Sequence, residues 1–198
     1  DESGEATIGG QMAACKANGI THMELRGFGP ELSINNLSVE QAKEMKAEID
    51  KEGMVVSSIG SGYGKINIKD DFEPHFEAFK NTVEVAKVLE AKYIRMFSFY
   101  FDEGDDFDAY RDEVIRRVKA LVDYADENGL ICCHENEKGI YGDTAERCLD
   151  VLQACEGKLR AVFDPANFIQ CGVDTLKAYD LLEDYIEYFH VKDALYNS

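Results

Sequence analysis

No stretch of the sequence approaches the roughly 20 apolar residues that a membrane-spanning helix needs. The opening segment, DESGEATIGG, also lacks the basic and apolar regions of a secretory signal peptide. We therefore expect the protein as given to be soluble, with no membrane partner.

Basic residues are scarce, because 21 lysines and arginines stand against 39 aspartates and glutamates, for a formal net charge of −18. Such a charge repels phosphate backbones and acidic lipid surfaces. We expect no nucleic-acid partner.

The six cysteines show no CxxC spacing, and several of them lie in apolar stretches where free thiols commonly pack. The tandem pair Cys132 and Cys133 fits a packed strand, in which one of the two faces the covering helices. Free thiols without a disulfide framework are typical of a reducing compartment, so we expect a cytoplasmic protein.

The composition is that of a folded protein, with 45% hydrophobic and 11% aromatic residues in a chain of 198. A chain of this length buries one sizeable core. We therefore predict a single domain that spans residues 1–198.

Helix-like segments repeatedly end in a glycine and lead directly into an apolar run, which fits the preference for glycine just past a helix. These stops recur at intervals of roughly 30–40 residues, each with one helix and one strand, which indicates an α/β fold rather than a helical solenoid. The stops are Asn18-Gly19-Ile20, Glu52-Gly53-Met54, Asn128-Gly129-Leu130 and Glu156-Gly157-Lys158, with Glu90-Ala91-Lys92 as a variant without glycine.

Two capping signals, Ser38 with Gln41 and Asp143 with Glu146, predict helix starts. From about Asp108 to Asp126 the apolar residues form one stripe, so we expect a helix that covers a sheet with one face. The stripe consists of Val114, Ile115, Val118, Leu121, Val122 and Ala125.

Two β-like runs in the second half of the chain, Ile131 to His134 and Leu159 to Phe163, flank a helical stretch from Thr144 to Cys155. Each run is followed by a carboxylate, Glu135 or Asp164. This arrangement predicts a β-α-β unit with an acid at both strand tips.

A third run, Ile186 to Val191, carries His190 near its end. A lone acid at a strand end commonly starts a turn or caps a helix. Here, however, a Glu, an Asp and a His stand at or near the ends of three successive predicted strands. Parallel strands place their carboxyl-terminal tips around one crevice, so Glu135, Asp164 and His190 would lie together. We predict that they bind one divalent ion, Mn, Mg, Co or Zn, whose identity the sequence does not encode.

The run THMELR alternates, with His22, Glu24 and Arg26 on one face and Met23 and Leu25 on the other. Helices cover the apolar face, so the polar residues look to the other side of the sheet. An open doubly wound sheet has helices on both faces and little room for such residues, whereas a barrel places them around its mouth. The pattern favours a barrel.

The segments HENEKGIYGDTAERCLD, FDPANFIQCG and YFHVKDA, with GITHMELR and AKYIRMFSF upstream, resemble the sugar phosphate isomerase/epimerase family. The fold of that family is the xylose isomerase-like TIM barrel, and the resemblance covers nearly the whole chain. It implies a divalent metal held by Glu135, Asp164 and His190. It also implies a fourth ligand, a Glu on the last strand that works with Glu135 as an acid/base pair; we expect it beyond Ser198.

Six strands are predicted, whereas a closed TIM barrel has eight. We therefore expect a TIM (β/α)8-type barrel that is incomplete, with about six βα units and the first and last strands missing. Open parallel edges make a poor stand-alone unit, so we expect either a longer chain or a homo-oligomer in which another copy covers the edges. The predicted strands lie near Ile20, Met54, Lys92, Leu130, Leu159 and Ile186.

The resemblance implies an enzyme of carbohydrate metabolism, a metal-dependent isomerase or epimerase of a ketose or sugar phosphate. Glu135 or a second base would remove the proton next to the substrate carbonyl, and an enediolate would follow. One alternative is a non-catalytic sugar-binding barrel that has lost its last ligand. Another is an apurinic endonuclease-like hydrolase, which four histidines in total, Asn167 in place of a ligand His and the charge of −18 all oppose.

Further residues are predicted to contact the substrate. Lys138 and Lys192 offer charges for a phosphate or for sugar hydroxyls, with a solvated lysine or a structural ion pair as the alternative. Asn167 stands where relatives such as the ketose 3-epimerases have a His three residues after the Asp. His22 and His134 are interpreted as scaffold histidines. The predicted substrate contacts are Glu24, Arg95, Lys138, Asn167 and Lys192.

Overall fold

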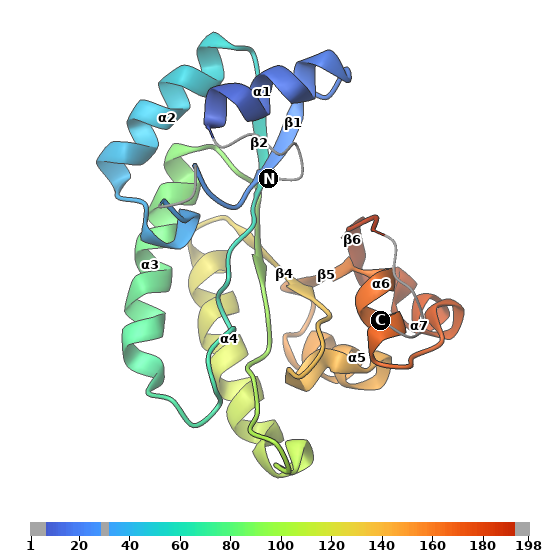
Figure 1. Cartoon of the computed structure of the whole chain (residues 1–198). Helices are drawn as coiled ribbons and strands as arrows, with labels where there is room; N and C mark the ends of the chain where they lie inside the picture. Colours follow the sequence, from blue (N-terminus) through green and yellow to red (C-terminus); the bar gives the residue numbers. More distant parts are fainter. Residues whose placement is uncertain (1–6, 29–31, 193–198) are drawn as a thin grey trace. The chain divides into compact units, whose positions relative to one another are not determined.

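The structure, a computed structural model, describes residues 7–28 and 32–192 (Figure 1). Six strands form one sheet in chain order, β1-β2-β3-β4-β5-β6. The pairs β1–β2, β2–β3, β4–β5 and β5–β6 are parallel, as predicted. The strands are β1 (His22–Leu25), β2 (Val55–Ile59), β3 (Tyr93–Met96), β4 (Ile131–Glu135), β5 (Leu159–Phe163) and β6 (Ile186–Phe189).

At least one helix separates each strand from the next, which confirms the predicted βα repeat. Six parallel strands with intervening helices are six of the eight βα units of a TIM barrel, so the predicted fold class is confirmed. The α-helices are α1 (Ile8–Ala17), α2 (Val39–Lys51), α3 (Phe72–Val88), α4 (Arg111–Glu127), α5 (Ala145–Ala154), α6 (Pro165–Gln170) and α7 (Thr175–Leu182). The 3-10 helices are η1 (Ile34–Asn36), η2 (Phe107–Tyr110), η3 (Tyr141–Asp143) and η4 (Glu183–Tyr185).

The chain divides into two compact units. The first comprises Asp1–Ser61 and Glu73–Ile94, and the second comprises Gly62–Phe72 and Arg95–Ser198. Of the residues predicted for the site, Glu24 belongs to the first unit and all others belong to the second.

In the first unit, β1 follows the predicted alternation, because Met23 and Leu25 are buried and Glu24 is half-buried. The predicted capping box is present at the start of α2, where the Ser38 hydroxyl accepts from the Gln41 N–H and the Gln41 side chain accepts from the Ser38 N–H. At the variant stop without glycine, Glu90 itself takes the left-handed conformation, with φ of 56°.

In the second unit, α4 packs against β4 and buries the predicted apolar stripe, except that Ile115 is only half-buried. The predicted helix from Thr144 to Cys155 corresponds to α5 with its two capping residues. The predicted capping residue Asp143 is wrong by one position. Asp143 still belongs to η3, and the extended Thr144 caps α5 by accepting from the Arg147 N–H, while Asp143 pairs with the Arg147 guanidinium.

All six cysteines are free. Cys132 and Cys133 are both buried in β4, as a packed strand requires, and burial raises the pKa of the Cys132 thiol. Within residues 7–28 and 32–192, no helix combines the length and apolar character needed to cross a bilayer.

A buried polar contact joins β4 to the segments that follow β3 and precede α5. The Gly142 N–H donates to the Ser98 hydroxyl at 2.8 Å, and the same hydroxyl is hydrogen-bonded to His134 Nε2 at 2.9 Å. His134 is 1% exposed, so it serves the scaffold as predicted. Burial lowers its pKa to about 4, although the Glu135 charge acts in the opposite direction.

The depressed pKa of His134 predicts a loss of stability in acid. Below the ordinary histidine pKa of 6.5 the unfolded chain takes up this proton while the folded chain resists it down to about pH 4. We expect His134 to contribute a fall of about 3 kcal/mol in the free energy of unfolding across that interval. Urea unfolding at a series of pH values should give a steeper acid loss for the wild type than for His134→Gln. Parallel curves would contradict the prediction, and His22→Gln, at an exposed histidine, is the control.

Gly142 lies so close to His134 that a side chain does not fit. A Cβ placed there would lie 2.4 Å from His134 Cε1 and 3.1 Å from Ser98 Oγ. We expect Gly142→Ala to lower the free energy of unfolding by about 1–3 kcal/mol, because a packed core must shift to admit the methyl group. The control is Gly9→Ala in α1, where nothing lies within 4 Å and alanine favours the helix. Equal denaturation midpoints for the two variants would rule out this explanation.

Candidate metal centre

Three predicted ligands lie at the same edge of the sheet because the strands that carry them are parallel. Glu135 is the last residue of β4 and pairs with Val162 of β5. Asp164 follows β5, and His190 follows β6. The His190 N–H donates to the Phe163 carbonyl at 3.1 Å, which extends the pairing one residue past β6.

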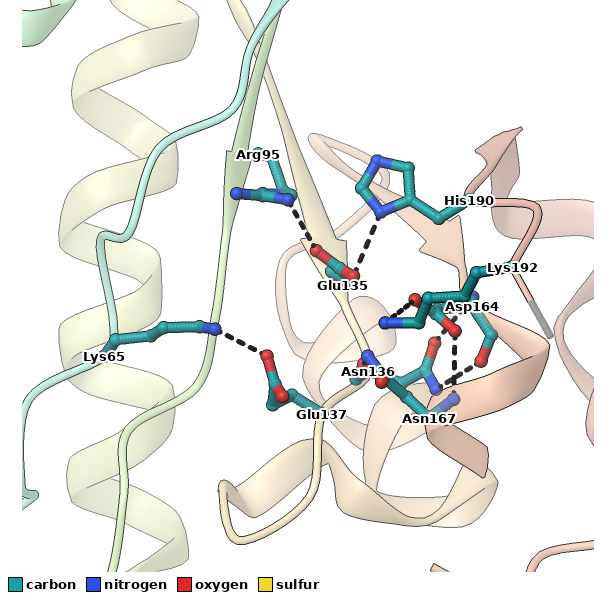
Figure 2. Close-up of polar contacts among 9 residues, drawn as sticks. All are labelled: Lys65, Arg95, Glu135, Asn136, Glu137, Asp164, Asn167, His190 and Lys192. Carbon is teal, nitrogen blue, oxygen red and sulfur yellow. Dashed lines mark hydrogen bonds and ion pairs between the residues drawn. The ribbon is translucent and has the colours of Figure 1, made fainter. Parts of the chain in front are cut away.

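The ligand atoms of Glu135, Asp164 and His190 lie within 4.8 Å of one another. Glu135 and Asp164 are 4% and 0% exposed, and His190 is partly buried. His190 Nδ1 lies 3.0 Å from Glu135 Oε1 (Figure 2). Because an ionised carboxylate only accepts hydrogen bonds, this contact assigns the proton of a neutral imidazole to Nδ1.

Two cations face the two carboxylates. Arg95 Nη1 lies 3.1 Å from Glu135 Oε2, and Lys192 Nζ lies 2.8 Å from Asp164 Oδ2 (Figure 2). Arg95 is buried, and its guanidinium lies 5.2 Å from the centre of the Phe97 ring. The Lys192 side chain is 48% exposed. One cation is therefore enclosed by protein, and the other reaches the site from solvent.

A pair of buried asparagines fixes the tips of β4 and β5. Asn136 Oδ1 accepts from the Asp164 N–H, and Asn136 Nδ2 donates to the Asp164 carbonyl, both at 2.9 Å. Asn167 Nδ2 donates to the Asn136 carbonyl at 2.8 Å (Figure 2). These bonds hold the backbone of Asp164 against the residue that follows Glu135.

Asp164 has a second task as the N-cap of α6. Its Oδ1 accepts from the Asn167 N–H at 2.9 Å, and Pro165 occupies the first turn, where the missing N–H has no cost. The capping alternative for a strand-end acid is thus correct for one oxygen. The other oxygen, Oδ2, points to the cluster and to Lys192.

The two carboxylates respond differently to their surroundings. Burial acts to raise the pKa of Glu135, but the His190 hydrogen bond and the Arg95 charge outweigh it and hold that pKa below its ordinary value. Burial raises the pKa of Asp164 despite the Lys192 ammonium and the Asn167 N–H. Glu135 is therefore the firmly ionised member of the pair.

The donor set fits a divalent ion. Glu135 Oε2 and Asp164 Oδ2 are buried, and each lies beside a cation, Arg95 at 3.1 Å and Lys192 at 2.8 Å. Two carboxylates and an imidazole are suitable ligands for Mn, Mg, Co or Zn. The fourth acid expected on the last strand lies outside the described residues.

The remaining predicted residues have separate placements. Lys138 is exposed in the turn after β4, and Glu24 lies in β1 of the first unit. Asn167 is 2% exposed, and its side-chain amide donates to the Asn136 carbonyl. The substrate contacts of Glu24, Arg95, Lys138, Asn167 and Lys192 remain predictions.

Sequence reasoning missed Asn136 and an ion pair beside the cluster. Lys65 Nζ lies 2.6 Å from Glu137 Oε2 (Figure 2). The same nitrogen lies 4.2 Å from the centre of the Phe97 ring. Lys65 follows β2 and Glu137 follows β4, so no local pattern links them. Asn136 could have been predicted as part of the site, because it directly follows a predicted ligand.

Comparisons with known proteins show which folds the chain is similar to. None of the curated proteins compared matches the sequence. Among solved structures, the probable 3-DHS dehydratase AsbF of Bacillus anthracis is 18% identical with a TM-score of 0.79, over 96% of this chain and 69% of that one. The 3-keto-D-glucoside 4-epimerase YcjR of E. coli is 16% identical with a TM-score of 0.74, over 93% and 73%.

A xylose isomerase-like TIM barrel protein from Mycobacterium smegmatis, solved in complex with magnesium, is 18% identical with a TM-score of 0.74, over 96% of this chain and 68% of that one. At these identities the structures show a shared fold. The family model described as xylose isomerase-like TIM barrel matches residues 12–198. The chain therefore belongs to the xylose isomerase-like TIM barrel family.

Proposed function

We propose that the protein is a metal-dependent isomerase or epimerase that moves a proton on a carbon next to the carbonyl of a sugar or sugar phosphate. The observation that carries this proposal is the convergence of Glu135, Asp164 and His190, whose ligand atoms lie within 4.8 Å of one another at the strand tips. Family membership and a structural neighbour named as a keto-sugar epimerase support it. The six free thiols support a cytoplasmic location.

Glu135, Asp164 and His190 would hold the ion. A bound divalent ion polarises a substrate carbonyl and makes the adjacent C–H more acidic. Arg95 keeps Glu135 ionised and in place, and Asn136 fixes the backbone of Asp164. The chain therefore presents a preformed set of anionic oxygens, as a site with fixed geometry requires.

Glu135 is also the proposed base. A carboxylate whose pKa is held down is a firm ligand and a weak base, so it accepts a proton only from a C–H that is already acidified. Lys138 and Lys192 are the proposed contacts for sugar hydroxyls or a phosphate. Lys138 is exposed, and Lys192 reaches the cluster from solvent.

The proposal is tested by proton exchange. The purified protein is stripped with a chelator, reloaded separately with Mn²⁺, Mg²⁺, Co²⁺ or Zn²⁺, and incubated in heavy water with a panel of ketoses and ketose phosphates. Mass spectrometry should show deuterium at a carbon next to the carbonyl of at least one sugar, only in the loaded protein. Exchange that survives the chelator would overturn the metal dependence. Sugar binding without exchange by any loaded form would replace the enzyme with a sugar-binding barrel.

A further inference from the structure

The charges around Glu135 and Asp164 balance before any metal binds. Two carboxylates face two cations, Arg95 at 3.1 Å and Lys192 at 2.8 Å. The neighbouring pair Lys65 and Glu137 adds no net charge. A divalent ion would therefore add two positive charges to a largely buried cluster that is already neutral, and desolvated like charges repel strongly.

The two cations differ in how easily each can move away from the carboxylate beside it. Arg95 is 7% exposed and lies against Phe97, so it cannot withdraw without opening the protein. Lys192 is 48% exposed along its side chain, and it lies beyond the end of β6. A lysine carries its charge on a flexible four-carbon stem, so its ammonium can exchange one partner for water at little cost.

The lysine also contacts a ligand atom. Its Nζ lies 2.8 Å from Asp164 Oδ2, while Oδ1 accepts from the Asn167 N–H. The ammonium and a metal ion would therefore compete for one oxygen of a fully buried carboxylate.

We propose that Lys192 is the resident counter-cation of the metal site, which neutralises Asp164 in the metal-free protein and is displaced when a divalent ion binds. The displaced ammonium, two residues from His190, is then available for an anionic group of the substrate. This inference rests on the proposed function for the identity of the site. It assigns Lys192 a positioning role that precedes any contact with substrate.

The first test measures Mn²⁺ affinity by calorimetry at one fixed pH. Lys192→Met should bind Mn²⁺ at least about 10-fold more tightly than the wild type, because the ion no longer has to displace a charged partner from Asp164. Lys192→Arg, which retains a cation, should stay close to the wild type. The control Lys138→Met removes the same charge from an exposed turn and should change the affinity much less. Equal tightening by Lys138→Met and Lys192→Met would overturn the proposal.

The second test measures displacement directly. Trace acetylation of the whole protein, followed by peptide mass spectrometry, should modify Lys192 faster after Mn²⁺ is added, while the rate at Lys138 stays constant. Lys192→Met should also lower the denaturation midpoint of the metal-free protein, with the deficit absent once Mn²⁺ is bound. A merely structural lysine would lower both midpoints and loosen the metal.

The outcomes separate this inference from the proposed function. If Mn²⁺ does not bind the wild-type protein, or binds equally well after Glu135→Gln, the proposed function and the inference fail together. If binding depends on Glu135 but Lys192→Met neither tightens it nor alters the metal-free protein selectively, only the inference is overturned.

Discussion

Glu135→Gln is expected to abolish metal retention and, with it, proton exchange on the sugar. The substitution keeps the size of the side chain and an oxygen that accepts from His190, but it removes the negative charge that faces Arg95. Loss of an anionic ligand should lower affinity by more than the roughly 10–100-fold typical of an outer-shell residue. The buried guanidinium also loses a charged partner, so the free energy of unfolding should fall by about 1–3 kcal/mol.

The matched control is Glu137→Gln, the same chemical change two residues along the chain. Glu137 pairs with Lys65 and is not one of the clustered ligands, so its variant should keep the metal. Elemental analysis after gel filtration gives the metal content, and deuterium uptake in heavy water gives the exchange rate. Equal metal content in the two variants would remove Glu135 from the ligand set. Unchanged uptake in Glu135→Gln would remove it as the base.

The clustering of the three residues was predictable because each stands at or near the end of a short β-like run, and parallel strands bring such positions to one edge. Because the local pattern indicates each strand and its direction, the placement of Glu135, Asp164 and His190 could be predicted without knowledge of distant contacts. The same holds for α4, whose apolar stripe is periodic in the sequence. Local sequence patterns were therefore sufficient to predict the fold class and the clustering of these three residues, whose role as metal ligands stays a prediction.

The contacts that support the ligands were not predictable in the same way. Lys65 forms an ion pair with Glu137, which is far away in the chain, and its ammonium lies over the Phe97 ring. Gly142 has a negative φ of −82°, so the proximity of His134 and Ser98, rather than a left-handed backbone, explains why it is a glycine. Interactions of this kind depend on the packed structure rather than on spacing.

The error at the start of α5 has a related cause. Both Asp143 and Thr144 are favourable capping residues, and Glu146 three residues after Asp143 completes a capping-box pattern. Tertiary contacts decide between them, because η3 is held by the Gly142 bond to Ser98 and extends through Asp143. The helix therefore begins one residue later than the local pattern indicates.

Asn136→Ala is expected to weaken the fold and the metal site together. Alanine removes the bonds that Asn136 makes at 2.9 Å to the Asp164 N–H and to the Asp164 carbonyl. The carbonyl still accepts from the Phe168 N–H at 3.4 Å, so the substitution leaves the buried N–H unpaired and weakens the pairing of the carbonyl. The unpaired N–H costs about 1–3 kcal/mol and the second lost bond about 0.5–1.5 kcal/mol, so the free energy of unfolding should fall by roughly 2–4 kcal/mol. Because those two groups belong to Asp164, a proposed ligand, Mn²⁺ affinity should also fall by about 10–100-fold.

The control for this prediction is Asn128→Ala, which removes the side-chain bond from Asn128 Nδ2 to the Tyr124 carbonyl at the end of α4. Its cost should be about 0.5–1.5 kcal/mol with no change in Mn²⁺ affinity. Urea unfolding measures the first quantity and calorimetry the second. If Asn136→Ala loses no more stability than Asn128→Ala and binds Mn²⁺ as the wild type does, then the tip of β5 is held by the Asp164 cap on α6 rather than by Asn136.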